Sequence, residues 1–280
     1  MGVRYEDMDR HDIPTAVAIG FTISVLSTLG HEGLGHGGAC VLTGCDPVQF
    51  SSTYFVGNKA GLSGGAIRTI SLGGTLFNLV LGLAFLALLR MTGPGAPARR
   101  YYVLWFGAMV NLVSASGYIL FGSAFAFGDY KTILEGAALP LRTGCILLGG
   151  VLYLGSLWVA ARNADPLLGS GPDRRSRLFA LVLLPAIVSS TIPSASALLS
   201  PVPEAALFSF IGHLFPAFGA WGMLQWFVGD GRGEPARNIA RSRAWWIAAA
   251  LVVLAVVAVG PGVPRATRAE LESRAGEERK

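Results

Sequence analysis

Seven stretches of this 280-residue chain contain no Asp, Glu, Lys or Arg, and each has about the length of a membrane span. They cover residues 13–30, 69–89, 101–128, 143–161, 178–203, 205–229 and 244–264. A helix needs about 20 predominantly apolar residues to cross a bilayer, where its backbone must satisfy its own hydrogen bonds. The chain is therefore predicted to be all-α, a polytopic transmembrane helical bundle of six to seven spans.

The charge content excludes several other classes of protein. Charged residues make up 14% of the chain, whereas a soluble domain has about 25%. The net charge of +5 comes from arginines between the apolar stretches, which set topology and contact anionic lipid. We therefore expect contact with a lipid bilayer and no nucleic-acid partner. Oligomeric state is not readable from these features.

The distribution of Lys and Arg predicts the orientation of the chain. The N-terminus and segments 90–100, 162–177 and 230–243 together carry 13 basic residues, against 4 in the opposite short loops. The positive-inside rule then places the N-terminus in the cytoplasm. We expect a multi-pass protein of a bacterial inner (plasma) membrane. The charged tail, residues 265–280, is expected outside as a short exposed helix or without structure.

Polar side chains within membrane spans are costly, and they indicate function by default. The outstanding group is His31-Glu32-Gly33-Leu34-Gly35-His36, at the end of the first apolar stretch. Zinc hydrolases use imidazole ligands, a further ligand and a carboxylate beside the open position. The segment is therefore predicted to bind a metal ion.

The two histidines are five residues apart, whereas the usual H-E-x-x-H signature places them four apart on one helical face. Five residues of ideal α-helix turn by roughly 500°, which leaves the two rings about 140° apart. A π-helical bulge would bring both rings to one ion, and the glycines around the motif favour such a deformation. The alternative uses Glu32 and His36, which are four apart, as the ligand pair. We prefer the bulged arrangement.

The string HEGLGHGGACVLTG resembles the H-E-x-G-H-A-x-x-A-x-x-T-G motif of the site-2-protease-like intramembrane zinc metallopeptidases, with one residue inserted. Residues Gly73–Val80 are similar to that family's G-P-x-x-N-hydrophobic helix. Asn111–Ser114, followed by Gly128-Asp129, resembles its later N-L-hydrophobic stretch and Asp-Gly motif, although Tyr130 stands where the family has Gly. The resemblance covers residues 20–135.

The resemblance implies a Zn²⁺ site with His31, His36 and Asp129 as ligands. It also implies Glu32 as the general base and Asn78 as a polar group near the substrate or the oxyanion. The chain would then be an integral membrane zinc metallopeptidase, which hydrolyses a peptide bond of a membrane protein or peptide in or near the membrane with metal-activated water. The alternative is a non-proteolytic membrane protein, a transporter or metal-binding scaffold, with a degenerate site.

We expect a metallopeptidase-like core with three spans over residues 1–137, an additional four-span region over 138–264, and the charged tail over 265–280. Several residues keep a second interpretation. Asp129 can cap a helix or pair with Lys131, and Glu135 is a spare carboxylate for the same ligand role. Asn78 can bond a neighbouring span instead of lying at a site. Cys40 is expected to be a small buried thiol, and His213 to have a structural role.

Overall fold

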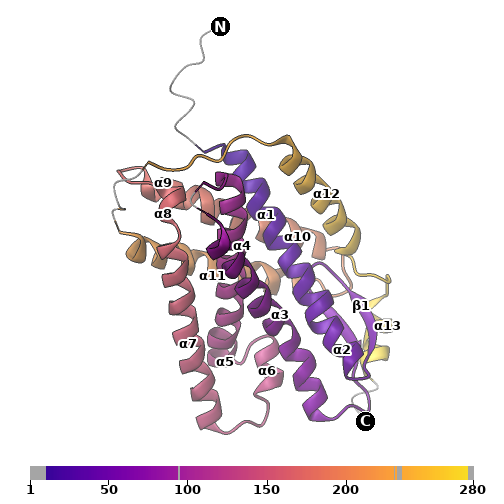
Figure 1. The fold of residues 1–280 in the computed structure, drawn as a ribbon. Coiled ribbons are helices and arrows are strands. Elements are labelled where there is room, and N and C mark those ends of the chain that lie inside the picture. Colours follow the sequence, from indigo (N-terminus) through magenta and orange to yellow (C-terminus); the bar gives the residue numbers. More distant parts are fainter. Residues whose placement is uncertain (1–10, 94, 230, 232–234, 277–280) are drawn as a thin grey trace.

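The computed structural model describes residues 11–93, 95–229, 231 and 235–276, and these residues are mostly helical (Figure 1). Three of the long helical rods contain π-helical segments, labelled η. The elements are α1 (Ile13–Gly30), η2 (His31–Gly37), α2 (Gly38–Leu42), β1 (Asp46–Phe50), β2 (Phe55–Asn58), α3 (Gly64–Met91), α4 (Ala98–Gly117), η3 (Tyr118–Gly122), α5 (Ser123–Phe125), α6 (Asp129–Ile133), α7 (Leu139–Arg162), α8 (Asp165–Leu168), α9 (Arg174–Leu178), η4 (Phe179–Leu183), α10 (Leu184–Ala197), α11 (Glu204–Val228), α12 (Arg243–Val259) and α13 (Arg268–Gly276).

Among the described residues, five helical rods are long and apolar enough to cross a membrane. They are Ile13–Leu42, Gly64–Met91, Ala98–Phe125, Leu139–Arg162 and Arg174–Ala197. Helix α12 is a shorter apolar helix, and α11 is 25 residues long with Glu204 as its one charged residue. The predicted class, a polytopic helical membrane protein, is confirmed.

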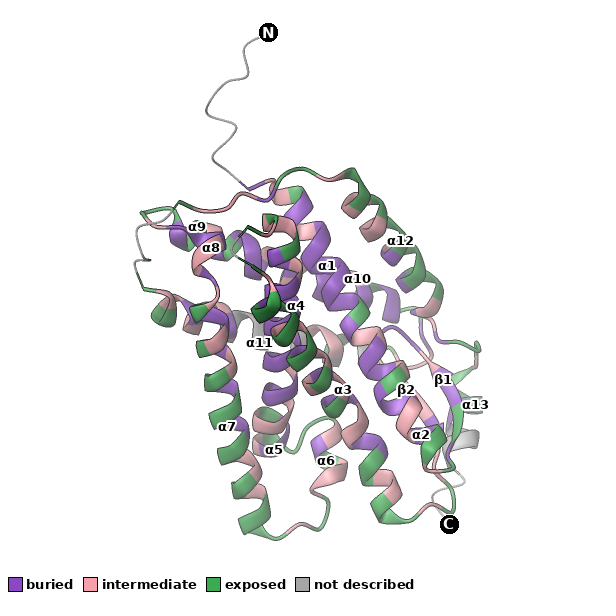
Figure 2. Cartoon of the chain, viewed as in Figure 1, coloured by how far each residue is buried: buried purple, intermediate pink, exposed green. Residues whose placement is uncertain are grey.

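Burial divides the helices into an inner and an outer group (Figure 2). About two thirds of the most apolar window is buried in the rods that contain α1 and α4 (61% and 67%), but only 28% in α3 and α7. Trp105 and Tyr102 of α4 are fully buried, and they donate to the carbonyl oxygens of Ala160 (2.8 Å) and Leu181 (2.7 Å). The outer faces of α3, α7 and α12 expose large aliphatic residues, as expected where helices face lipid.

The segments rich in arginine meet at one end of the bundle. The Tyr101 hydroxyl donates to the Asn163 carbonyl oxygen (2.9 Å), and the Arg237 N–H donates to the Pro166 carbonyl oxygen (2.8 Å). The Asp12 N–H donates to the Ile239 carbonyl oxygen (2.8 Å), which brings the start of α1 to the same place. The described parts of the segments that the Lys and Arg count grouped on one side of the membrane are therefore neighbours in space.

The opposite end carries a hairpin and a disulfide that were not expected from the sequence. Strands β1 and β2 form an antiparallel hairpin, and a disulfide joins Cys40 of α2 to Cys45 just before β1, with the Cα atoms 4.7 Å apart. The expectation of a free Cys40 thiol is therefore wrong, because the turn after α2 brings Cys45 back against it. Phe50 of β1 pairs with Val263 through two backbone hydrogen bonds. This pairing places the segment before α13 at the same end as α2 and α6 (Figure 1).

Candidate metal centre

The histidine motif adopts the deformation that its spacing requires. Residues His31–Gly37 form η2, a π-helical turn inside a rod that is α-helical on either side. The Gly38 N–H donates to the Gly33 carbonyl oxygen, five residues back, which is the bonding pattern that defines a π-helix. The rings of His31 and His36 consequently meet edge to face with centroids 4.8 Å apart, and their Nε2 atoms are 3.2 Å apart. The predicted bulge is confirmed.

Asp129 completes a three-residue cluster with these imidazoles. Its Oδ2 atom lies 3.4 Å from His36 Nε2 and 3.9 Å from His31 Nε2. Asp129 is the first residue of α6 and follows Gly128, whose φ of 56° favours glycine. Both histidines are buried and Asp129 is partly exposed. His31, His36 and Asp129 therefore form a group that could hold a metal ion.

The donor set and its dimensions fit zinc. Tetrahedral zinc with bonds of about 2.0–2.1 Å to nitrogen and oxygen separates its ligand atoms by about 3.3 Å. The three separations in this cluster are 3.2, 3.4 and 3.9 Å. Two imidazole nitrogens and a carboxylate oxygen are a ligand set used by catalytic zinc sites, which leave a fourth position open. No large movement of the side chains is needed to bind such an ion.

A backbone carbonyl sets the tautomer of His36. The Nδ1 atom of His36 lies 2.8 Å from the carbonyl oxygen of Ile70 on α3. Nδ1 must donate to this acceptor, so the neutral ring presents the lone pair of Nε2 to the cluster. Such outer hydrogen bonds orient metal-ligating histidines and raise their basicity. Helix α3 therefore orients His36 without contributing a residue to the cluster.

Glycines allow α3 to approach the motif this closely. A Cβ atom at Gly74 would lie 2.6 Å from His36 Nε2 and would also overlap the His31 ring. A Cβ atom at Gly35 would lie 2.7 Å from the Gly74 Cα atom, and one at Gly73 would overlap the Gly35 backbone. The Gly-Gly pair that resembles a family motif in the sequence thus has a direct steric role at the cluster.

Two further predicted site residues are buried beside the cluster or along the same helix face. Glu32 is 9% exposed and interacts electrostatically with His36 and Asp129. Asn78 lies one turn after Gly74 on α3, and its Oδ1 atom is buried without a hydrogen-bond partner among the described residues. Their roles as general base and substrate-binding group remain predictions. The cluster does not contain the alternative ligand pair of Glu32 and His36, because His31 and not Glu32 lies beside His36 and Asp129 in it.

Other residues with a predicted role lie elsewhere. Glu135 is not a member of the cluster, and its backbone carbonyl accepts a hydrogen bond from Arg68. Asn111 has a structural contact, since its Nδ2 donates to Ser27 Oγ (2.9 Å) and so ties α4 to α1. His213 lies outside the residues whose side chains the structure describes.

Tyr118 lies against the cluster, although no pattern in the sequence pointed to it. Its ring centroid is 5.3 Å from that of His31, and the two planes are tilted by 36°. It begins η3, the π-helical segment that follows α4. The residue lies in a charge-free stretch with several other aromatic residues, so no spacing or composition signal separates it from interfacial or core tyrosines.

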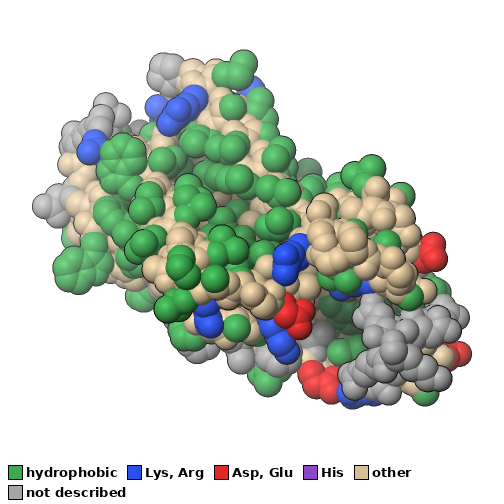
Figure 3. Space-filling view, turned by 90° about the horizontal axis from the view of Figure 1, so that it is seen from below, with side chains coloured by type: hydrophobic (Ala, Val, Ile, Leu, Met, Phe, Trp, Pro, Cys, Tyr) green, Lys and Arg blue, Asp and Glu red, His purple; other side chains and the backbone are tan. Residues whose placement is uncertain are grey.

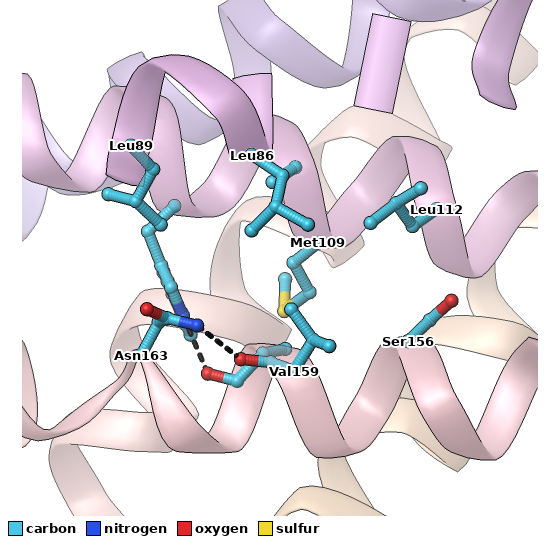
Figure 4. Close-up of a pocket in the computed structure, with 10 residues that line it drawn as sticks. Leu86, Leu89, Met109, Leu112, Ser156, Val159 and Asn163 are labelled. Carbon is cyan, nitrogen blue, oxygen red and sulfur yellow. Dashed lines mark hydrogen bonds between the residues drawn. The ribbon is translucent and has the colours of Figure 1, made fainter. Parts of the chain in front are cut away.

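A small pocket between α3, α4 and α7 is distinct from this cluster (Figure 4). Leu86, Leu89, Met109 and Leu112 contribute to a mostly apolar lining. Its polar side chains are already engaged: Asn163 Nδ2, for example, donates to the Val159 carbonyl oxygen (2.8 Å). We interpret this pocket as a gap in helix packing and not as a ligand site.

Comparison of the chain with protein-family models, with curated proteins and with solved structures finds no match. The assignment of the cluster therefore depends on its geometry and on the chemistry of its donor atoms.

Proposed function

We propose that this protein is a zinc-dependent membrane peptidase of the site-2-protease type, with His31, His36 and Asp129 as metal ligands. The convergence of these three residues beside a buried Glu32 is the observation that carries the proposal. The order of the motifs along the chain supports it, because the residues brought together are those that resemble the family's motifs.

When bound, the zinc ion would supply a Lewis acid that lowers the pKa of water to near neutrality. The residues of the chain then divide the remaining work. Glu32 accepts the proton of the attacking water and passes it to the amine that leaves, as a general base and then a general acid. The Ile70 carbonyl holds His36 in its ligating tautomer. The Asn78 amide is available to bond the substrate.

The proposal includes an extracytoplasmic position for the metal centre. The basic segments meet at the end of the bundle where α1 begins, and the positive-inside rule assigns that end to the cytoplasm. The cluster lies toward the other end, where the Cys40–Cys45 bond is found, and disulfides persist in oxidising compartments. Charge and cysteine chemistry thus support the same orientation.

An apolar substrate suits the surroundings of this end. Figure 3 views it from below and shows hydrophobic side chains over much of the face, with few charged ones. Leu34 of η2, Phe125 of α5 and Leu139 of α7 are each more than 70% exposed. Side chains of this kind contact lipid or the apolar part of a membrane-bound peptide. We therefore assign the substrate class as membrane proteins or peptides that reach the outer half of the bilayer.

Metal content and turnover of purified variants test the proposal. Wild-type protein is expected to hold one zinc ion per chain, and His36→Ala is expected to lose it. Glu32→Gln should retain the zinc while turnover of a fluorogenic transmembrane peptide is abolished in both variants. Glu135→Gln, which changes a carboxylate outside the cluster, serves as the matched control and should behave as wild type.

The outcomes separate the two functions that the sequence leaves open. No zinc in the wild type would contradict the metal centre itself. Zinc in the wild type, lost in His36→Ala, together with no peptide turnover by any form would contradict the peptidase and favour the metal-binding scaffold.

A further inference from the structure

The phenol of Tyr118 is held at the metal cluster by two elements that also position Asp129. Tyr118 begins η3, and Gly122 at the end of η3 packs directly on Tyr130 of α6, where an added Cβ would lie 2.9 Å from the Tyr130 Cβ. Asp129 is the neighbour of Tyr130 at the start of α6. Close packing of η3 on α6 therefore fixes the phenol and the carboxylate relative to each other.

The Tyr118 hydroxyl differs from those of three other tyrosines, because the structure shows no acceptor for it among the described residues. The hydroxyls of Tyr54, Tyr101 and Tyr102 donate to Gln49, Asn163 and Leu181 respectively. Among the described residues, Tyr118 makes no such bond. Phenol hydroxyls inside proteins usually have a partner. The Tyr118 ring lies 5.3 Å from the ring of the predicted ligand His31, so its O–H, which has no acceptor among the described residues, is available to a substrate at the cluster.

We infer that Tyr118 is a catalytic residue, which donates a hydrogen bond to the substrate oxygen on which negative charge develops during peptide hydrolysis. This inference rests on the proposed peptidase function and adds a hydrogen-bond donor to the polar group that Asn78 provides. Peptide hydrolysis places negative charge on the carbonyl oxygen, and donors aimed at that oxygen stabilise the transition state. The phenol donates a hydrogen bond without transferring its proton, so no further reactant is required.

Binding of acetohydroxamate tests this role without a known substrate. Acetohydroxamate is an anionic oxygen chelator, and its binding to Co²⁺-substituted protein can be followed by visible absorption. Tyr118→Phe keeps the ring against His31 and removes only the hydroxyl. We expect it to weaken hydroxamate affinity about tenfold, the effect of losing one hydrogen bond to an anionic acceptor. Affinity for Co²⁺ and for imidazole, a neutral ligand without an anionic oxygen, should stay unchanged.

Tyr153→Phe provides the matched control, because Tyr153 is a buried tyrosine of α7 whose ring packs on Phe121 and which is not a member of the cluster. It should bind hydroxamate as wild type does. Equal hydroxamate affinity in Tyr118→Phe and wild type would overturn the inference, as would a parallel loss of hydroxamate, imidazole and Co²⁺ affinity, which marks a structural role. Metal-loaded wild type that binds no hydroxamate would also overturn it. Failure of the wild type to bind metal would instead contradict the proposed function.

Discussion

Gly74 shows how a single residue without a side chain can determine the geometry of a candidate metal site. It lies on α3 where that helix approaches both imidazoles, and the backbone of Gly35 also packs against it. A side chain at position 74 would overlap the two imidazoles unless α3 or η2 moved. Movement of α3 would also displace Ile70, whose carbonyl accepts the hydrogen bond from His36. The position of the helix and the tautomer of the ligand are thus coupled through one residue.

Gly74→Ala is accordingly expected to weaken zinc affinity by tenfold or more, since loss of outer-sphere support for a ligating histidine costs about 10–100-fold. Competition with a chromophoric chelator measures the affinity. The control is Gly65→Ala, on the same helix, where an added Cβ meets only Ser63 Oγ at 3.8 Å. Unchanged zinc affinity in Gly74→Ala would show that the approach of α3 does not hold the ligands in place.

At the scale of elements, two of the three π-helical segments among the described residues lie at the cluster. Segment η2 carries both histidines and η3 carries Tyr118, and π-helical turns recur at functional sites because they re-aim side chains within a regular rod. The rod continues as α2, whose end is joined to the start of β1 by the Cys40–Cys45 bond. Gly57 of β2 packs on this disulfide, where an added Cβ would lie 2.9 Å from Cys40 Sγ. Hairpin and helix end therefore form one unit.

Thiol trapping in intact cells tests both this unit and the orientation of the chain. When the protein from these cells is denatured in an alkylating reagent without reductant, we expect one modified cysteine per chain. This cysteine is Cys145, the free cysteine in the structure. After reduction, three cysteines should react. Cys145→Ser should then leave none reactive before reduction. Three reactive cysteines without reductant would contradict the disulfide and remove its support for an extracytoplasmic position of this end.

At the scale of the whole molecule, His11 joins three segments that are distant in sequence. The Ile239 N–H donates to His11 Nδ1 (3.1 Å), so the neutral ring donates from Nε2 to the Leu167 carbonyl oxygen (2.9 Å). The start of α1, helix α8 and the segment before α12 meet at this imidazole. Burial is the main cause that lowers the pKa of His11 below its usual 6.5, and Arg177 lowers it further, while the bond to Leu167 acts in the opposite direction. The folded protein therefore favours the neutral ring.

This lowered pKa predicts that stability falls with acidification. Below about pH 6.5 the unfolded chain binds a proton at His11 that the folded protein resists, so the free energy of unfolding decreases by up to about 1.4 kcal/mol per pH unit until the folded-state pKa is reached. Above pH 6.5 this contribution is fully present. Melting temperatures between pH 8 and pH 5 measure the effect.

The control for His11 is His11→Asn, whose amide oxygen can take the place of Nδ1 as acceptor but does not titrate. It should flatten the difference between pH 8 and pH 5 relative to wild type, and this comparison removes the contribution of other titrating groups. A pH dependence that is the same in both proteins would exclude His11 as its source.

The amino-acid sequence by itself determined the membrane class, the helical spans and the deformation of the histidine motif. A long charge-free stretch that crosses lipid forms a helix, because the helix satisfies its own backbone hydrogen bonds. Two histidines five residues apart on a regular α-helix point in different directions, and a π-helical bulge brings their rings together. These are local properties of the chain, so the pattern alone predicts them. The division into a region of three spans and a region of four is not tested by the structure and stays a prediction.

Only the tertiary structure decided which distant residues meet. Asp129 reaches the imidazoles because α6 starts with a turn through Gly128 and packs on η3. Tyr118 joins them although no motif distinguishes it, and Cys45 bonds to Cys40 because the turn after α2 folds back. Each contact depends on how helices pack, which is set by the shapes of many side chains together and by glycines such as Gly74. The periodicity and composition of any one segment carry no information about this packing.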